Sequence, residues 1–264
     1  MAPASFKAGF VQFDVRTGAV ADNLAEAEAR LAHLADEGAA LAVLPEMWSC
    51  GFDNANLDQH ARRTPEILER LSRLATRHRM VIGGSLPERE GGRIYNTLYL
   101  LDADGAVAGA YRKVHLFSVT DEHRYFSAGD RCVVCPTALG PVGLMICYDL
   151  RFPELCRTLA LQGAWIVIAP AQWPDARIDV WDVLARARAM ENQLYIIGAN
   201  RCGMENNTRF SGHSIIVDPG GRILAHAPGG VPCTGSAVLD QGSLQRIREK
   251  VPALEERMPG VYDL

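Results

Sequence analysis

The chain has 264 residues, 48% of them hydrophobic and 22% charged, a balance typical of a globular protein with a buried core. Its net charge of −4 gives no electrostatic basis for nucleic acid or an anionic membrane as the main partner. No apolar run is long enough to span a membrane, and Lys7 interrupts any signal-peptide pattern, so we expect a cytoplasmic protein.

The first half of the chain predicts strands that alternate with helices. Apolar runs predict strands and an amphipathic run predicts a helix: strands at 6–15, 41–46, 80–85, 95–101 and 106–112, and a helix over 21–39. Thr64, Pro65 and Glu66 predict the start of a second helix, with an N-cap, a proline at the first helical position and an acidic first turn. The sequence at 102–105, Asp-Ala-Asp-Gly, predicts a hairpin.

The second half repeats the alternation and then continues with strands. The expected elements are strands at 132–136, 142–147, 165–170, 194–200, 213–218, 222–227 and 236–240, helices at 153–162 and 180–193, and a short amphipathic helix after 241. No linker divides the chain, so we expect one domain over 1–264. This order of elements indicates an α/β protein with helices outside the sheet.

Cys147 lies where an apolar strand meets a polar turn, in the stretch GLMICYDLRFPELCR at 143–157. A lone cysteine after such a strand is commonly an inert core residue. It can act as a nucleophile only with a base or a positive charge nearby, because the thiol must lose its proton. No histidine fits the local pattern, so the partners must come from elsewhere in the chain.

Three other charged residues also follow apolar segments. Glu46 comes directly after an apolar run and a proline, Lys113 ends a strand, and Glu122 lies in the next loop. Singly, each is an ordinary loop carboxylate or surface lysine. Together with a thiol they supply a base, a fixed positive charge and a second acid.

Such a set of groups suits acyl transfer through a thioester. A carboxylate whose pKa is raised by partial burial can take the thiol proton and later give it to a leaving amine. The Lys113 ammonium can stabilise both the thiolate and the oxyanion on the carbonyl, and the backbone N–H of Tyr148 is the candidate second oxyanion donor. Water then hydrolyses the thioester.

The runs LPEMW, YRKVHLF and CYDLRFPEL, in that order and spacing, resemble the motifs of the nitrilase superfamily of carbon–nitrogen hydrolases. APAQWP, WDVLARARAMENQLYIIGANR and FSGHSIIVDPGGRILA are similar to the same family further along the chain. Each motif alone is weak, but the ordered set is specific. The resemblance extends from about Phe6 to about Lys250.

The resemblance implies a four-layer α-β-β-α sandwich and a Glu–Lys–Cys triad, which falls on Glu46, Lys113 and Cys147. The second glutamate of the family falls on Glu122, with Asp121 as the alternative. The resemblance also implies a homodimer or higher homo-oligomer, packed through 152–162 and the tail from about 241.

The motifs also indicate a branch of the family. Tyr148 and Asp149 follow the cysteine where true nitrilases tend to have Trp-Glu, which favours amides over nitriles. CYDLRFPEL with QWP and ANR is most similar to the omega-amidase branch, which hydrolyses the terminal amide of 2-oxoglutaramate and related omega-amides. The branch acting on deaminated glutathione is a close alternative. Nitrile hydrolysis, N-carbamoyl hydrolysis and a non-catalytic binding role are the others.

A small anionic substrate needs a cationic partner, ideally a bidentate arginine. Arg151, Arg177 and Arg201 are the candidates, although Arg151 could instead brace the loop after the cysteine. Trp173 and Phe117 are candidates for the pocket walls, although aromatic residues are commonly plain core.

The cysteine and histidine pattern gives no indication of a metal or a cofactor. Seven cysteines, an odd count, indicate reduced thiols. Cys132 and Cys135 have the spacing of a redox motif, but side chains three apart in a strand point to opposite faces. The seven histidines are scattered, and none pairs with cysteine or carboxylates at zinc-ligand spacing. We therefore expect no metal site and no cofactor.

Overall fold

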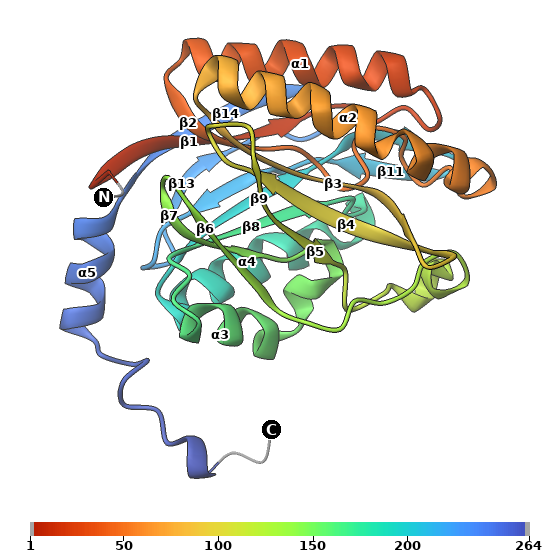
Figure 1. Cartoon of the computed structure of the whole chain (residues 1–264). Coiled ribbons are helices and arrows are strands. Elements are labelled where there is room, and N and C mark those ends of the chain that lie inside the picture. The colour runs from red at the N-terminus through yellow and green to blue at the C-terminus, as the bar shows by residue number, and fades with distance from the viewer. Residues whose placement is uncertain (1–2, 262–264) are drawn as a thin grey trace.

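The computed structural model describes residues 3–261 and consists of two six-stranded sheets packed face to face, with helices on the outer side of each (Figure 1). The helices α1 (Val20–Asp36) and α2 (Leu57–His78) cover the first sheet. The helices α3 (Pro153–Leu161) and α4 (Ile178–Asn192) cover the second. This arrangement confirms the expected four-layer α-β-β-α sandwich. Within residues 3–261, none of the helices combines the length and apolar character needed to cross a bilayer.

The first sheet has the strand order β14-β1-β2-β3-β4-β5. Its strands are β14 (Cys233–Asp240), β1 (Ser5–Gln12), β2 (Ala39–Val43), β3 (Val81–Glu90), β4 (Arg93–Leu101) and β5 (Val107–Arg112). The strands β1, β2 and β3 run parallel, and β4, β5 and β14 are antiparallel to their neighbours. The parallel strands are nearly continuous apolar runs, as expected for strands that are covered on both faces.

The second sheet has the order β13-β12-β9-β8-β7-β6. Its strands are β13 (Ile223–His226), β12 (Ile215–Val217), β9 (Tyr195–Asn200), β8 (Ile166–Ala171), β7 (Gly140–Leu144) and β6 (Val133–Thr137). Here β7, β8 and β9 form the parallel centre. Both sheets therefore place parallel strands in the middle, and the carboxyl ends of those strands lead into the loops that carry the predicted site.

The main apolar core lies between the two sheets and continues to α3 and α4, while a second core lies between the first sheet and α1 and α2. Gly83 of β3 allows the sheets to approach each other closely. A Cβ at this position would lie 2.5 Å from Cδ1 of Ile168 in β8, far inside van der Waals contact. The contact across this glycine helps to fix how one sheet is stacked on the other.

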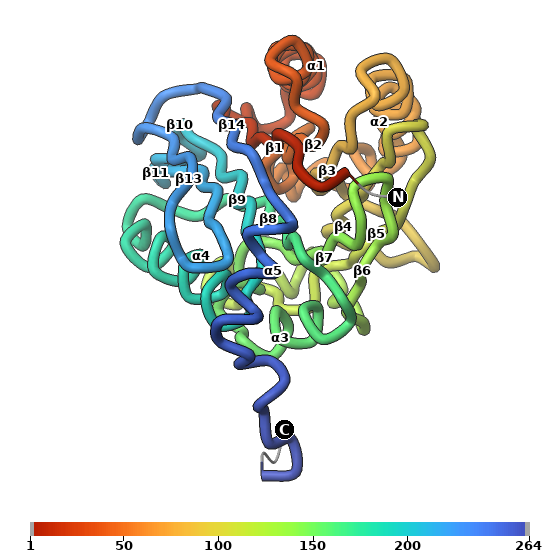
Figure 2. Tube along the Cα trace, turned by 90° about the vertical axis from the view of Figure 1, so that its left-hand side faces the viewer, coloured from red at the N-terminus to blue at the C-terminus, as the bar shows by residue number. Residues whose placement is uncertain are grey.

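The C-terminal part leaves the body of the sandwich. α5 (Gln241–Lys250) follows β14, and its N-cap Asp240 accepts hydrogen bonds from the backbone of Gly242 and Ser243. Residues 251–261, after α5, extend away from the two sheets (Figures 1 and 2). Residues 262–264 of the predicted tail lie outside the described residues.

The predicted start of the second helix is wrong, because α2 begins at Leu57 and Pro65 lies inside it. Leu57 and Ala61 are buried, so the extra turns at the N-terminus bury apolar surface that outweighs the hydrogen bond lost at the proline. The hydroxyl of Thr64 does not cap the helix. It donates instead to the carbonyl of Pro87 at 2.5 Å, which ties α2 to β3.

The turn at Cys147 and one hairpin also differ from the prediction. The strand expected over 142–147 ends at Leu144, and Cys147 begins a short 3₁₀ helix, η4 (Cys147–Arg151). A hairpin of β10 (Cys202–Glu205) and β11 (Thr208–Ser211) was not predicted. Its strands are only four residues long, and most of its residues are polar, so no apolar alternation marks them.

Candidate active site

A cavity of about 620 Å³ opens where the carboxyl ends of the central strands meet. Glu46, Lys113, Glu122 and Cys147 all line it, although each of their side chains is almost completely buried. Glu46 follows β2 and Lys113 follows β5, both in the first sheet. Cys147 follows β7 in the second sheet. The fold thus brings four residues from distant parts of the chain to one cavity.

Lys113 is held between two carboxylates. Its Nζ donates to Oε1 of Glu46 at 2.8 Å and to both carboxylate oxygens of Glu122 at 2.9 Å. The side chain of Lys113 is 2% exposed and that of Glu46 is 1% exposed. Asp121, the alternative to Glu122, lies at the surface and pairs with Arg124. Of the two candidates for the second acid, Glu122 and not Asp121 therefore contacts the Lys113 ammonium together with Glu46.

Burial and charge together determine the protonation states in this cluster. Burial alone would lower the pKa of Lys113, but the two glutamates outweigh it and hold the pKa well above its usual value. Burial raises the pKa of Glu46, and Lys113 offsets part of that effect. Burial, reinforced by the charge of Glu46, raises the pKa of Cys147 well above its usual value, although Lys113 opposes this. The resting group is therefore a thiol, and its proton must leave as it reacts.

Cys147 lies on a sharp turn between β7 and η4. Its φ is +47°, in the left-handed region that residues other than glycine rarely adopt. Asp149 holds this turn, because its carboxylate accepts hydrogen bonds from Ile146 N at 2.9 Å and from the Tyr111 hydroxyl at 2.8 Å. It also accepts from Nδ1 of His115 at 2.7 Å. A strained nucleophile turn of this kind presents the side chain to the cavity.

Tyr148 is the second residue of η4 and lines the same cavity. The first backbone N–H groups of a helix have no partner within the helix, so the N–H of Tyr148 is suited to an oxyanion. The ring of Tyr148 packs at 4.8 Å from that of Phe117 and at 5.3 Å from that of Phe152. These ring contacts help to hold the turn at Cys147 in place.

Arg151, Arg177, Trp173 and Phe117 also line the cavity. The guanidinium carbon of Arg151 lies 5.1 Å from the centre of the Trp173 ring, and that of Arg177 lies 5.4 Å from the centre of the Phe117 ring. Among residues 3–261, neither arginine forms an ion pair with a carboxylate. Two guanidinium groups near aromatic rings therefore line the cavity without a carboxylate partner among these residues.

The structure does not bring Arg201 to the cavity lining. Its side chain is completely buried, with Nη2 3.0 Å from Oδ1 of Asp14 and Nη1 bonded to Glu205. Because Glu205 does line the cavity, Arg201 supports the wall instead of facing a ligand. The prediction that Arg201 contacts substrate needs this correction: a buried guanidinium takes the nearest carboxylates as partners.

Several residues that line the cavity or contact Glu46 were not predicted from the sequence. Asn96 donates to Oε1 of Glu46 at 2.8 Å, and the backbone N–H of Gln172 donates to Oε2 of the same carboxylate at 2.9 Å. Arg209 of β11 lines the cavity as a third arginine. For Gln172 the sequence does contain a signal, because this residue begins the QWP stretch directly after the end of β8, where side chains reach the cavity.

A thiol, a buried carboxylate and a fixed ammonium around one cavity are the groups needed for nucleophilic substitution at a carbonyl. The carboxylate can move a proton, and the ammonium and the turn N–H can stabilise negative charge on oxygen. The cavity lining contains no cluster of metal ligands among the described residues.

Comparisons with known proteins agree with this chemistry. The carbon-nitrogen hydrolase family matches residues 7–249. The chain is 35% identical to the 2-oxoglutaramate amidase of Bacillus subtilis over 254 residues, covering 96% of this chain and 97% of that protein. It is 34% identical to omega-amidase NIT2-A of Xenopus laevis, covering 99% of this chain and 98% of that protein.

Solved structures lead to the same family. The carbon-nitrogen hydrolase from Helicobacter pylori G27 superimposes with a TM-score of 0.93 at 26% identity, covering 98% of this chain and 97% of that one. A mutant amidase from Nesterenkonia sp. AN1, which carries the acetamide moiety of fluoroacetamide on its active site cysteine, has a TM-score of 0.87 at 27% identity. That match covers 99% of this chain and 97% of that one. The sequence match, the shared fold and the site chemistry establish that this chain belongs to the carbon-nitrogen hydrolase family and is a hydrolase of non-peptide carbon–nitrogen bonds.

Proposed function

We propose that this chain is an omega-amidase-type thiol amidohydrolase that cleaves the terminal amide of a small substrate carrying a carboxylate, such as 2-oxoglutaramate. The observation that carries the proposal is the ammonium of Lys113, held between Glu46 and Glu122 in the cavity that Cys147 enters. The relatives named 2-oxoglutaramate amidase and omega-amidase support the choice of substrate class.

The first half of the proposed reaction releases ammonia. The sulfur of Cys147 attacks the amide carbon while Glu46 takes the thiol proton, because a thiol with a raised pKa needs a base during the attack. Lys113 and the N–H of Tyr148 stabilise the oxyanion of the tetrahedral intermediate. Glu46 then gives the proton to the amide nitrogen, the carbon–nitrogen bond breaks, and ammonia leaves behind a thioester.

The second half consumes water. Glu46 takes a proton from a water molecule as its oxygen attacks the thioester carbon, and the same donors stabilise the second oxyanion. The carbon–sulfur bond breaks, the product carboxylic acid leaves, and the proton returns to the sulfur. The burial that raises the pKa of Glu46 suits a group that must both accept and donate this proton near neutral pH.

The carboxylate of the substrate is assigned to the arginines of the cavity wall. Arg151 and Arg177 have their charge free of protein carboxylates among residues 3–261, and a guanidinium binds a carboxylate through two parallel hydrogen bonds. A neutral amide of the same length gains nothing from these groups. We therefore expect the enzyme to prefer amides whose far end is negatively charged.

The test is ammonia release across 2-oxoglutaramate, succinamate, deaminated glutathione, neutral butyramide and butyronitrile. We expect acid and ammonia from the first two, with a kcat/KM at least about ten-fold above that for butyramide. Arg151→Met or Arg177→Met should lower kcat/KM for succinamate by about 10- to 100-fold and leave butyramide nearly unchanged. Arg131→Met is the matched control, because Arg131 is exposed and pairs with Asp130.

Two outcomes would reject parts of this assignment. Equal rates for succinamate and butyramide in the wild type and in both arginine variants would rule out the carboxylate subsite while leaving the amidase chemistry in place. Release of carbon dioxide together with ammonia from an N-carbamoyl substrate, with no turnover of omega-amides, would identify a decarbamoylase instead.

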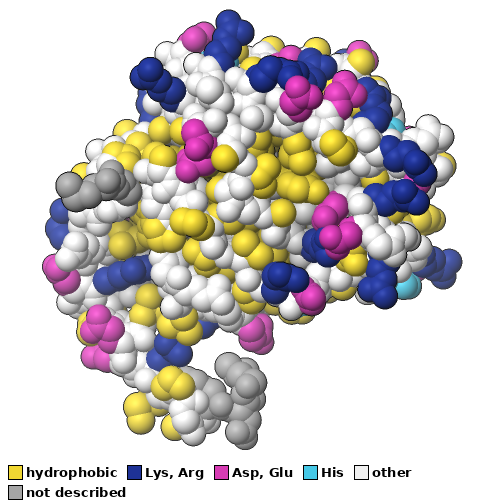
Figure 3. Space-filling view, viewed as in Figure 1, with side chains coloured by type: hydrophobic (Ala, Val, Ile, Leu, Met, Phe, Trp, Pro, Cys, Tyr) yellow, Lys and Arg dark blue, Asp and Glu magenta, His cyan; other side chains and the backbone are white. Residues whose placement is uncertain are grey.

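We also propose that residues 1–264 form one domain and that the protein works in the cytoplasm as a homodimer or higher homo-oligomer. All seven cysteines are free, which suits a reducing compartment. The tail projects from the body with Val251, Met258 and Val261 exposed, and Figure 3 shows apolar side chains on the tail and across the middle of the body. Exposed apolar surface of this kind is typical of an interface.

Sedimentation velocity tests the oligomer. The full chain should sediment as a dimer or larger at micromolar concentration, and a chain that ends at Lys250 should shift toward the monomer. A full chain that sediments as a monomer throughout this range would contradict the proposal. Cell fractionation checks the compartment, since recovery in an oxidising compartment would contradict a cytoplasmic location.

A further inference from the structure

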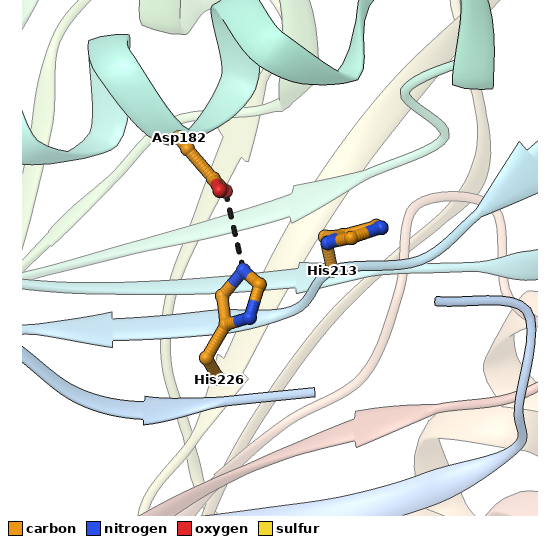
Figure 4. A group of neighbouring side chains, drawn as sticks. All are labelled: Asp182, His213 and His226. Carbon is orange, nitrogen blue, oxygen red and sulfur yellow. Dashed lines mark hydrogen bonds and ion pairs between the residues drawn. The ribbon is translucent and has the colours of Figure 1, made fainter. Parts of the chain in front are cut away.

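Three side chains of types that can bind a metal lie together outside the active-site cavity: Asp182, His213 and His226 (Figure 4). Asp182 is on α4, His226 ends β13, and His213 precedes β12. One ligand atom from each lies within 4.8 Å of the other two. No sequence pattern marks this group, because its members are 31 and 13 positions apart and approach one another only in the folded protein.

The pair formed by Asp182 and His226 has the spacing of two metal ligands. Oδ1 of Asp182 lies 3.4 Å from Nε2 of His226, which is long for a hydrogen bond between a nitrogen and an oxygen. Two ligands about 2.0–2.1 Å from a tetrahedral zinc ion are about 3.4 Å apart. Among residues 3–261, no lysine or arginine pairs with Asp182, so its charge is available to a cation.

His213 completes the group from the side. Its ring centroid lies 5.2 Å from that of His226, and Figure 4 shows one of its nitrogens on the side that faces the other two residues. Gly229 leaves room for this ring, because a Cβ there would lie 2.9 Å from Nε2 of His213. One ring nitrogen of His213 lies within 4.8 Å of the ligand atoms of both Asp182 and His226.

The backbone around the group is already fixed. Nε1 of Trp181 donates to the carbonyl of His213 at 2.8 Å, and Trp181 directly precedes Asp182 on α4. His213 is held at a φ of +58°, which positions its side chain off the line of the strand. Such support of the ligands by their neighbours is what a metal site needs in order to bind without reordering the protein.

From this geometry we propose that Asp182, His213 and His226 form a binding site for a divalent transition metal of the zinc class. Two imidazoles and one carboxylate are a donor set that suits zinc and leaves a fourth position for water. The bound ion joins α4 to the β12–β13 edge of the second sheet. It takes no part in the proposed amide hydrolysis, so the site and the amidase chemistry stand or fall separately.

Calorimetric titration of the tag-free Cys147→Ala chain with ZnCl₂ tests the site, since this background removes the reactive thiol as a competing ligand. We expect one zinc per chain at micromolar Kd, weakened at least about ten-fold by His226→Ala and by Asp182→Asn. His33→Ala is the matched control, because His33 is an exposed helical histidine whose one acidic partner at ion-pair distance, within residues 3–261, is Glu37.

Thermal unfolding supplies an independent readout. Saturating zinc should raise the Tm of the parent chain by about 5 °C, and the rise should disappear in His226→Ala. The His33→Ala control should keep both the affinity and the rise in Tm. Zinc affinity unchanged by both site variants, or the absence of binding below about 100 μM, would overturn the proposal.

Discussion

Replacing Cys147 with alanine is expected to reduce ammonia release from an omega-amide by at least about 10⁴-fold while the protein stays folded. In the proposed mechanism this thiol forms the thioester, and without it only binding and oxyanion stabilisation remain. The change removes one sulfur atom from the cavity wall and keeps the Cβ, so circular dichroism and the Tm should stay close to wild type. An enzyme-coupled ammonia assay measures the loss.

Cys132→Ala is the matched control for this experiment, because Cys132 is a partly exposed thiol that is not in the cavity lining. Its turnover should equal that of wild type. The Cys147→Ser variant should be nearly as inactive as Cys147→Ala, because a serine hydroxyl is harder to deprotonate than a thiol. Ammonia release at more than a few percent of the wild-type rate in Cys147→Ala would remove Cys147 from the mechanism.

Lys113→Met is expected to have a double effect, on turnover and on stability. Losing the ammonium removes one oxyanion donor and should lower kcat by about 10³-fold. It also leaves Glu46 and Glu122 buried together without their shared cation, which should lower the free energy of unfolding at pH 8 by about 3–5 kcal/mol. Chemical denaturation and the ammonia assay measure the two effects.

A second variant separates these effects. Lys113→Met combined with Glu122→Gln removes one of the two buried charges, so part of the lost stability should return while turnover stays low. Recovery of turnover together with stability would mean that Lys113 has only a structural role. A turnover of Lys113→Met within ten-fold of the wild-type value would contradict the proposed catalytic role of Lys113.

The pH dependence of Lys113→Met stability has a definite sign. Burial raises the pKa of Glu46 already in the wild type, and the loss of Lys113 removes the interaction that lowers it. A carboxyl whose pKa is higher in the folded protein than in the unfolded chain favours folding when it is protonated. The deficit of the variant should therefore shrink as the pH falls from 8 through the raised pKa of Glu46 toward 5.

The meeting of Glu46, Lys113 and Cys147 in one cavity could be predicted because the three residues stand in short motifs at strand ends. Asn96 and the backbone of Gln172 could not be assigned their contacts with Glu46 in the same way. No local sequence pattern predicts that an asparagine inside a strand will contact a buried carboxylate 50 positions away. Contacts of this kind depend on which strands are neighbours, and strand order is a property of the whole sheet.

The bounds of the helices and strands could likewise be predicted only where a local pattern determines them. The apolar runs located the central strands of both sheets, since burial on both faces leaves a plain signal. The start of α2 was predicted from Thr64, Pro65 and Glu66, a local capping pattern that burial of Leu57 and Ala61 overrides. The burial of the Arg201 side chain away from the cavity could not be predicted either, because one of its partners, Asp14, is far away in the sequence.

Glu46 and Lys113 follow strands of one sheet, whereas Cys147 follows a strand of the other, so the groups of the proposed reaction meet across the seam between two separately hydrogen-bonded layers. A slide of one layer over the other by a fraction of an ångström would misalign the chemistry before it cost the protein its fold. The tight approach at Gly83 and Ile168 therefore sets the spacing on which the proposed chemistry depends, and we expect turnover to respond to a change at this contact before the Tm does.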